Sequence, residues 1–210
     1  MGAVVTRVAG ILLAAGDGTR LGQPKATVEL GGITLAERGA RLLRDGGADP
    51  VLLVTGAAAA LVPGTIPVHN PDWASGMGSS LAAGLRALAA QSAADVTAVV
   101  IALADQPLIG PAAVRRLVAA HAAGASVAVA AYGGKQRNPV LIARGHWAAV
   151  GAAAAGDTGA RPFLRAHPEL VTPVECGDVG RPDDIDTPED LARVRSRLCP
   201  PSWPRRAGPD

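Results

Sequence analysis

Residues 8–25 read VAGILLAAGDGTRLGQPK, an apolar run that passes directly into glycines and then presents Arg20, Pro24 and Lys25 within one loop. The run at residues 8–13 does not alternate with polar residues, which indicates a strand buried on both faces. Open backbone amides and two cations after such a strand suit an anionic ligand, because together they neutralise and position phosphate oxygens. The stretch therefore predicts a phosphate-binding loop that follows a buried strand.

Two well-known phosphate loops fit this stretch poorly. A P-loop places its lysine directly after the last glycine, whereas Gln23 follows Gly22 here and Ala26 follows Lys25. A dinucleotide-binding loop spaces its glycines as G-x-G-x-x-G at the start of a helix, but here the third glycine comes one residue late and Pro24 would break the helix. The P-loop is excluded, and a Rossmann cofactor site stays open as the weaker alternative. An extended loop that holds a triphosphate is the preferred interpretation.

The remaining chain alternates short apolar runs with longer helical patterns, which is typical of an α/β fold. Capping motifs mark two helices: Thr34 with Glu37 starts one that ends at Gly46, and Thr187 with Asp190 starts the last one. Strands are predicted at residues 8–13, 51–55, 66–69, 97–104, 127–132, 139–143 and 170–175. Further helices are predicted at 79–88, 111–123, 146–153 and 160–166. We expect one domain over residues 1–198 and a disordered, proline-rich tail over 199–210.

Composition excludes several classes of protein. The net charge is only +2 and the basic residues are dispersed, which argues against a nucleic-acid partner. Every apolar run is too short to span a bilayer before a charge or turn interrupts it, which argues against a membrane protein. Cys176 and Cys199 form no CxxC pair, and the four histidines show no metal-ligand spacing. We therefore expect a cytoplasmic protein.

Carboxylates follow the predicted sheet at two places. Asp105 ends the strand at residues 97–104, at the edge where open α/β sheets bind ligands, and it is too far from Pro111 to cap the next helix. Asp183, Asp184 and Asp186 crowd before the last helix, in greater number than a helix cap requires. Since hard divalent cations prefer carboxylate oxygens, Asp105 and one of these three acids are candidate metal ligands.

Lys25 is one of only two lysines in a chain that otherwise uses arginine, the other being Lys135. Its compact ammonium on a flexible stem suits a phosphoryl group that moves during a reaction. We therefore expect Lys25 to contact phosphate.

Six segments together resemble one enzyme family. The loop at 12–25 resembles the signature L-A-A-G-x-G-x-R-x-G-x-x-K of the nucleotidyltransferases with a MobA-like fold. NPDWASGMGSSLAAGL (70–85), LADQP (103–107), NPVLIARGHW (138–147), GDTGARPFL (156–164) and DIDTPEDL (184–191) are similar, in the same order, to the molybdenum cofactor cytidylyltransferase branch. The resemblance extends from Val8 to Leu198.

The resemblance implies a fold, a reaction and partners. The fold would be a Rossmann-like three-layer sandwich with a mostly parallel sheet. The reaction would be Mg²⁺-dependent transfer of a nucleotidyl group, CMP in this branch, from a nucleoside triphosphate to a phosphorylated acceptor of the molybdopterin type, with release of pyrophosphate. A molybdoenzyme or its chaperone would be the protein partner.

The resemblance also implies roles for individual residues. Arg20 and Lys25 would hold the triphosphate as catalytic residues, and Asp105 and Asp186 would bind the metal. The residues implied to bind the nucleotide or to face the acceptor are Leu13, Ala14, Ala15, Gly16, Gly18, Arg20, Lys25, Asn70, Gly76, Ser79, Ser80 and Asp105.

Two positions bear on the choice of substrates. Asn138 stands before a proline where this branch more often carries glycine, which leaves the acceptor open. Ala15 stands where guanylyltransferase relatives carry a second glycine, which favours cytosine. Alternatives are a nucleotidyltransferase that makes a sugar nucleotide or a guanylylated deazaflavin precursor, and a non-catalytic cofactor carrier or chaperone with the same fold.

Overall fold

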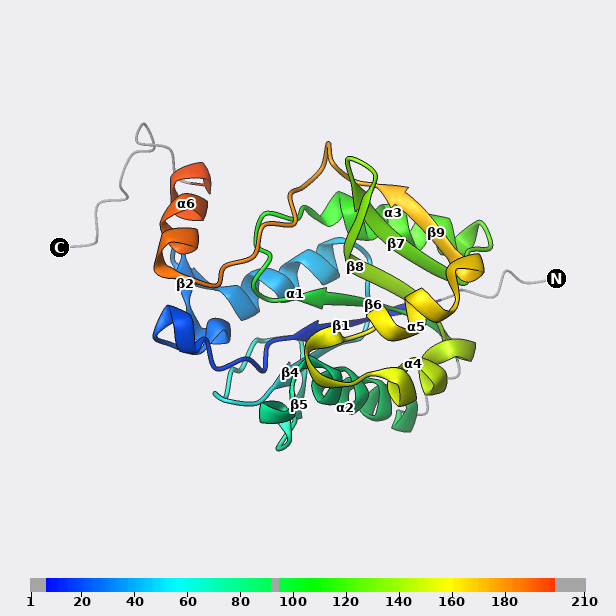
Figure 1. The fold of residues 1–210 in the computed structure, drawn as a ribbon, viewed down its shortest axis with the longest axis horizontal. Helices are drawn as coiled ribbons and strands as arrows, with labels where there is room; N and C mark the ends of the chain where they lie inside the picture. Colours follow the sequence, from blue (N-terminus) through cyan, green and yellow to red (C-terminus); the bar gives the residue numbers. More distant parts are fainter. Residues whose placement is uncertain (1–6, 92–94, 199–210) are drawn as a thin grey trace.

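A seven-stranded sheet lies between two layers of helices in the computed structural model, which describes residues 7–91 and 95–198 (Figure 1). The strand order is β5-β4-β1-β6-β8-β7-β9. The strands are β1 Arg7–Leu13, β4 Val51–Thr55, β5 Ile66–His69, β6 Val96–Leu103, β7 Val127–Tyr132, β8 Lys135–Ala143 and β9 Val171–Glu175. The tail predicted at 199–210 lies outside the described residues.

The sheet is mostly parallel, as the sequence predicts. β1 pairs in parallel with β4 and β6, β4 with β5, and β7 with β9. β8 runs antiparallel to both of its neighbours, β6 and β7, and a tight turn at Gly133 and Gly134 joins it to β7. The carboxyl ends of β1, β4 and β6 therefore meet at one edge of the sheet, where the predicted ligand loops begin.

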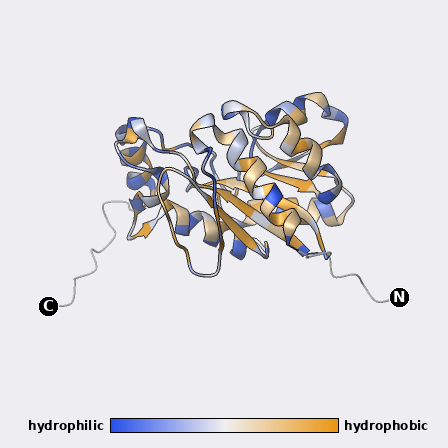
Figure 2. Ribbon diagram, turned by 90° about the horizontal axis from the view of Figure 1, so that it is seen from below, coloured by the Kyte–Doolittle hydropathy of each residue, from blue (hydrophilic) through white to orange (hydrophobic). Residues whose placement is uncertain are grey.

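Helices cover both faces of the sheet. α1 (Leu35–Asp45) and α3 (Pro111–Ala122) pack on one face, and α2 (Met77–Ala90), α4 (Trp147–Ala153) and α5 (Arg161–Ala166) pack on the other. The central strands are buried on both sides and consist of Ala, Val, Leu and Ile, so they carry the hydrophobic colour in Figure 2. The predicted three-layer α/β sandwich in one domain is confirmed.

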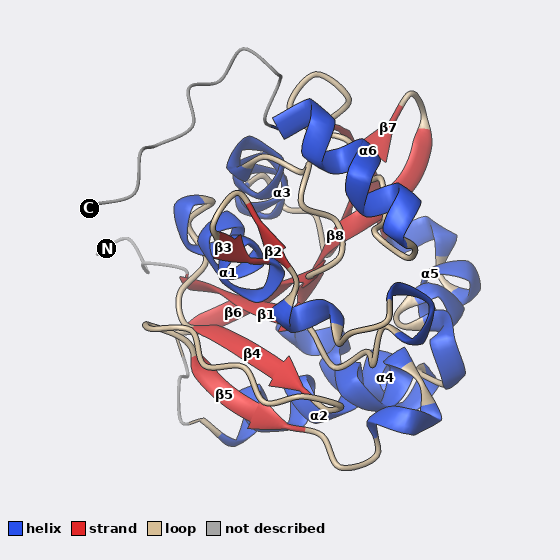
Figure 3. Cartoon of the chain, turned by 90° about the vertical axis from the view of Figure 1, so that its left-hand side faces the viewer, coloured by secondary structure: helices blue, strands red, loops and turns tan. Residues whose placement is uncertain are grey.

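A small satellite core lies beside the ligand edge of the sheet. α6 (Pro188–Leu198) packs there against a hairpin of β2 (Glu29–Leu30) and β3 (Ile33–Thr34) (Figure 3). Its buried residues are Leu21, Val28, Leu30, Leu35, Ile185, Leu191 and Val194. The hairpin was not predicted, since two-residue strands leave no periodic pattern. This cluster joins the signature loop to the segment before α6.

The predicted element boundaries shift where tertiary contacts extend an element. β8 begins at Lys135 instead of residue 139, because polar residues pair with β7 on the exposed part of the hairpin. α1 starts as predicted, with the Glu37 amide donating to Thr34 Oγ1 at 3.1 Å, although the Glu37 carboxylate pairs with Arg41. No helix among residues 7–91 and 95–198 is long and apolar enough to cross a membrane.

Candidate active site

The signature loop folds back on itself after β1. It forms two short 3₁₀ turns, Thr19–Leu21 and Lys25–Thr27, in place of the single extended loop predicted from the sequence. Gly18 has a φ of 64°, and a Cβ at this position would lie 2.0 Å from the carbonyl oxygen of Gln23, so the turn requires glycine. This fold places the charged ends of the loop on one side, toward the ends of other strands.

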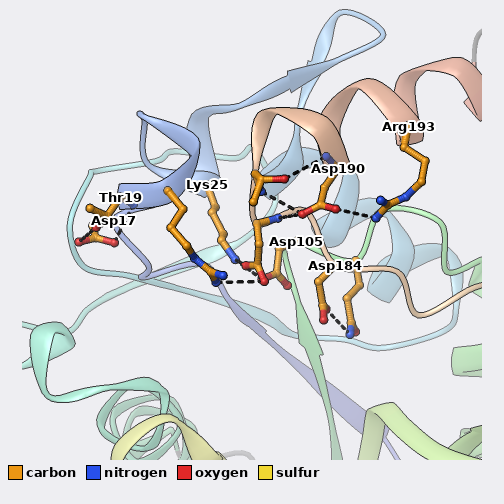
Figure 4. Close-up of polar contacts among 11 residues, drawn as sticks. Asp17, Thr19, Lys25, Asp105, Asp184, Asp190 and Arg193 are labelled. Carbon is orange, nitrogen blue, oxygen red and sulfur yellow. Dashed lines mark hydrogen bonds and ion pairs between the residues drawn. The ribbon is translucent and has the colours of Figure 1, made fainter.

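Cations and carboxylates meet at the end of β6 (Figure 4). Lys25 Nζ donates to Asp105 Oδ2 at 2.7 Å and also to Asp186 Oδ1, and Arg20 Nη2 lies 3.1 Å from Asp186 Oδ2. Burial alone would lower the pKa of Lys25, but the two carboxylates outweigh it and the pKa is raised. The hydrogen bond from Lys25 lowers the pKa of Asp186. All four charged residues implied by the resemblance are thus brought together.

The three crowded aspartates have different partners. Asp183 pairs with Arg181 at 2.9 Å and with Arg197, away from the cluster. Asp184 accepts a hydrogen bond from Gln106 Nε2 at 2.8 Å, and desolvation together with its acidic neighbours raises its pKa. Only Asp186 among these three joins Lys25. The geometry therefore brings Asp186, the acid that the resemblance names, into the charged cluster and leaves Asp183 outside it.

The start of α6 holds Asp186 in place. Asp190 Oδ2 accepts hydrogen bonds from the amides of Asp186 and Thr187, at 3.1 and 3.0 Å, and the Asp190 amide donates to Thr187 Oγ1 at 3.2 Å. Arg193 in turn donates to Asp190 at 2.6 Å (Figure 4). This reciprocal cap confirms the predicted helix start and fixes the backbone that presents the Asp186 carboxylate.

A first cavity of about 290 Å³ lies over the signature loop. Of the sequence-predicted residues, those that line it are Leu13, Ala14, Ala15, Gly16, Gly18, Arg20, Lys25, Ser80, Asp105 and Asp186. Trp73, to which the sequence assigned no role, also lines it, as does Met77 from the segment between Gly76 and Ser80. An aromatic residue in a glycine-rich loop was the signal that could have indicated Trp73, because loops at a ligand edge carry binding residues.

Asn70, Gly76 and Ser79 do not line the first cavity. Asn70 is only 2 % exposed, and its Nδ2 donates to the hydroxyls of Ser79 and Ser80 at 2.9 and 3.0 Å. Its Oδ1 accepts from the Asp72 amide at 3.1 Å. The side chain of Asn70 therefore organises the loop before α2, and Ser80 is the member of this network that reaches the cavity.

A second cavity of about 860 Å³ adjoins the first. The residues common to both are Leu13, Arg20, Lys25, Met77, Leu103, Asp105 and Asp186. Three arginines line the second cavity but not the first: Arg137, Arg161 and Arg165. None of them forms an ion pair with an acidic side chain within the described part of the chain. Asn138, the position that departs from the cytidylyltransferase pattern, lines it too.

Asp105 and Asp186 fit a divalent metal ion. Asp105 Oδ1 is buried and has no hydrogen-bond partner, while its Oδ2 and the Asp186 carboxylate face the same ammonium. Within residues 7–91 and 95–198, no three His, Cys, Asp or Glu side chains gather into a metal-binding group. Mg²⁺ is commonly held by one or two carboxylates, with phosphate and water completing its shell, so this pair satisfies its needs.

The fold and this site define a nucleotidyltransferase of the MobA-like type. Residues 10–171 match the family model of the MobA-like NTP transferase domain, and the chain belongs to that family. It is 39 % identical over 202 residues to nicotine blue oxidoreductase of Paenarthrobacter nicotinovorans, an alignment covering 89 % of this chain and 96 % of that protein. It is also 46 % identical over 54 residues to a probable molybdenum cofactor guanylyltransferase of Opitutus terrae, covering 26 % of this chain and 27 % of that protein.

Solved structures have the same architecture. A homologue of Mycobacterium tuberculosis rv0371c from Mycobacterium sp. strain JC1 is 28 % identical with a TM-score of 0.77, covering 91 % of this chain and 96 % of that one. A manganese complex of Rv0371c from Mycobacterium tuberculosis H37Rv is 25 % identical with a TM-score of 0.69, covering 91 % and 99 %. These neighbours confirm the fold over nearly the whole described chain.

Proposed function

We propose that this protein transfers CMP from CTP to a phosphorylated acceptor of the molybdopterin type and releases pyrophosphate. The observation that carries the proposal is the cluster of Arg20, Lys25, Asp105 and Asp186 at the junction of two adjoining cavities. A two-substrate transfer needs its reacting atoms held together between two binding sites. Charged residues at that junction suit phosphate chemistry.

The first cavity suits the nucleotide donor. Residues Leu13 to Gly18 line it, four of which are glycine or alanine and leave their backbone accessible, and the cations Arg20 and Lys25 line it too. Backbone groups can hydrogen-bond a base and a ribose, while the cations neutralise a triphosphate. The methyl group of Ala15 narrows this cavity relative to a glycine, which supports cytosine over the larger guanine.

The second cavity suits an anionic acceptor. The second cavity carries three exposed arginines, Arg137, Arg161 and Arg165, none of which forms an ion pair with an acidic side chain among the described residues. Its volume of about 860 Å³ accommodates a molecule of cofactor size. The molybdopterin-type acceptor is supported by the similarity to the probable molybdenum cofactor guanylyltransferase of Opitutus terrae. A molybdoenzyme or its chaperone as the recipient is a prediction from the resemblance.

Asp105 and Asp186 would hold Mg²⁺, which supplies Lewis-acid stabilisation of phosphate charge when bound. The manganese complex of a structural neighbour supports a divalent ion at this fold. Lys25 Nζ donates to both carboxylates, so a metal ion held by those carboxylates would take its place and its ammonium would become available to the phosphates. Arg20, whose side chain is largely exposed, is placed to stabilise charge on the leaving pyrophosphate. The acceptor phosphate is already an anion at neutral pH, so the mechanism requires no strong general base.

An oxidoreductase is the second candidate function. It is favoured by the 39 % identity to nicotine blue oxidoreductase over 96 % of that protein. In this case the first cavity would hold a redox cofactor that contains a nucleotide, and the second would hold the molecule to be reduced or oxidised. Asp105 and Asp186 would then bind no metal ion, so the two candidate functions differ in whether activity requires a metal.

The deciding experiment measures pyrophosphate release from CTP, GTP, ATP and UTP with Mg²⁺ and a molybdopterin acceptor. We expect release to be fastest with CTP and to require both the acceptor and the metal. Release with a sugar phosphate in place of molybdopterin would indicate the sugar-nucleotide alternative. Nucleotide binding without release, with every acceptor, would favour a carrier, and oxidation of a reduced nicotinamide dinucleotide would favour the oxidoreductase.

A further inference from the structure

We propose that Trp73 is the surface on which the nucleobase stacks in the first cavity. The proposal rests on the proposed function in one respect, namely that this cavity takes a nucleoside triphosphate. Stacking on an aromatic ring accepts any base, because every base has a π-face. Trp73 would therefore supply affinity for the nucleotide without choosing among bases, and the choice would be made elsewhere in the same cavity.

The residues shared by the two cavities indicate at which end of the first cavity the base would lie. Arg20, Lys25, Asp105 and Asp186 line both cavities, so the phosphates belong at the shared end. The base must then lie toward the residues that line the first cavity alone, which are Ala14, Ala15, Gly16, Asp17, Gly18, Thr19, Trp73, Ser80 and Ala104. Trp73 is the one aromatic side chain among the residues that line this cavity, and so the one π-surface offered to a base.

The end of β4 is shaped to accept the tryptophan. A Cβ on Gly56 would lie 2.3 Å from Trp73 Cβ, 2.6 Å from Trp73 Cγ and 3.0 Å from Ala15 Cβ. Gly56 therefore permits a close approach that no other residue allows at this position. The Ala57 amide donates to the Ala15 carbonyl at 3.1 Å, which fixes Gly56 against the signature loop. Trp73 consequently lies beside the alanine that distinguishes this loop from its double-glycine relatives.

Hydrogen bonds hold the loop that carries Trp73. The Asp72 carbonyl accepts from the Ser75 amide, from Ser75 Oγ and from Ser79 Oγ, at 3.0, 2.7 and 2.9 Å. The Gly76 amide donates to the Trp73 carbonyl at 3.1 Å, and the buried Asn70 fixes the Asp72 amide. A rigid support lowers the entropy lost when a ligand binds, so an aromatic residue held this way is suited to binding.

Trp147, a tryptophan of the hydrophobic core, differs from Trp73 in burial and in the hydrogen bonding of its indole N–H. It is 6 % exposed, begins α4 and packs on the sheet, and its Nε1 donates to the Ile142 carbonyl at 3.0 Å. Trp73 is half-buried, belongs to a 3₁₀ turn, and its indole N–H has no hydrogen-bond partner among the described residues. A buried indole normally finds a partner, and one that faces a cavity can find it in a ligand or in water.

The test compares binding of CTP with binding of inorganic tripolyphosphate, both with Mg²⁺, by calorimetry on the full chain. We expect Trp73→Ala to weaken CTP binding about 10- to 100-fold while tripolyphosphate binding changes by less than about twofold, since only the base contact is lost. Trp73→Phe keeps a ring and should restore most of the affinity. An equal loss for both ligands would show a structural role and overturn the proposal, as would unchanged CTP binding in Trp73→Ala.

Tryptophan fluorescence gives an independent readout. CTP should change the emission of the wild-type protein and of Trp147→Phe by the same amount, and should leave the emission of Trp73→Phe unchanged. A CTP-dependent change that persists in Trp73→Phe would contradict stacking at this residue. The two proposals fail differently: if CTP alters Trp73 emission but no pyrophosphate is released, transfer is wrong and stacking stands. If pyrophosphate is released while the Trp73 variants bind CTP normally, stacking is wrong and transfer stands.

Discussion

The two cavities that meet at Lys25 are built in different ways. The first is lined largely by one continuous stretch, from Leu13 to Arg20, and half of its residues are glycine or alanine, whose small side chains leave the backbone accessible. The second is lined by side chains from β6, β8, α5 and the segment before α6, which lie far apart in the sequence. A backbone site is preserved through most substitutions, whereas a side-chain site changes with each one. Substitutions are therefore expected to change what the second cavity binds more readily than what the first cavity binds.

Asp105→Asn should have the largest effect, because Asp105 belongs to both cavities. We expect the rate of pyrophosphate release to fall about 100- to 1,000-fold, since a lost metal carboxylate removes several kcal/mol of transition-state stabilisation. The measurement is the metal-dependent rate at saturating CTP. The thermal unfolding midpoint should change little, since Asp105 is a partly exposed residue at the end of β6.

Asp183→Asn is the matched control for this variant. Asp183 lies in the same acidic segment as Asp186, but it pairs with Arg181 and Arg197 and lines neither cavity. We expect its activity to stay within about twofold of wild type, as for a surface substitution. Equal losses in Asp105→Asn and Asp183→Asn would indicate a general charge effect and remove Asp105 from the metal site.

Lys25→Ala should reduce the rate about 100-fold, and Lys25→Arg should recover only part of it. The ammonium reaches Asp105 and Asp186 together, and the longer, planar guanidinium cannot occupy the same point between two carboxylates. Lys135→Ala, the other lysine of the chain, is the control and should be silent because its side chain is exposed on β8. Full activity in Lys25→Arg would show that charge alone matters, and full activity in Lys25→Ala would place the residue outside the mechanism.

The same contrast explains what could be predicted from sequence. The signature loop after β1 and the strand-end position of Asp105 follow from the local pattern of apolar run, glycines and turn, so the place of both in the fold was predictable. The residue pattern alone did not single out Asp186 from Asp183 and Asp184, and only the family resemblance named it, because its place depends on contact with a lysine 161 residues away in sequence. The arginines of the second cavity were not predictable either. They come together only because β8 runs antiparallel beside β6, and a hairpin's place in a sheet leaves no local signal.

Base preference tests the donor cavity alone. We expect CTP to be used about 10- to 100-fold better than GTP, because the wrong base leaves polar edges unpaired at roughly 1–3 kcal/mol each. Ala15→Gly should reduce this ratio, since it removes the methyl group that narrows the cavity beside Trp73. The measurement is kcat/KM for each triphosphate. Equal or better use of GTP by the wild type would defeat the cytidylyl assignment, and an unchanged ratio in Ala15→Gly would move the selectivity to another residue.

Arg161→Ala should have the smallest effect, and it should weaken binding of the acceptor without changing binding of CTP. Arg161 lines the second cavity and not the first, and among the described residues no acidic side chain pairs with it. Its charge is therefore available to the acceptor, but its exposure to solvent weakens the contact. We expect the KM for the acceptor to rise about tenfold, because the loss of one hydrogen bond to a charged group, at the low end of its energy range, changes affinity by about that factor. The KM for CTP should stay constant.

The salt dependence of the acceptor KM and a control substitution at another arginine test the role of the charge on Arg161. If Arg161 attracts an anionic acceptor, added salt should raise the wild-type acceptor KM and should affect Arg161→Ala less, because the screened charge is already gone. Arg86→Ala removes an exposed arginine on α2 that lines neither cavity, and it should leave both KM values unchanged. A rise in the CTP KM with Arg161→Ala would mean that the two cavities do not hold separate substrates. That result would contradict the assignment of the nucleotide to the first cavity and of the acceptor to the second. A rise in the acceptor KM alone would establish that the acceptor binds in the second cavity, through side chains.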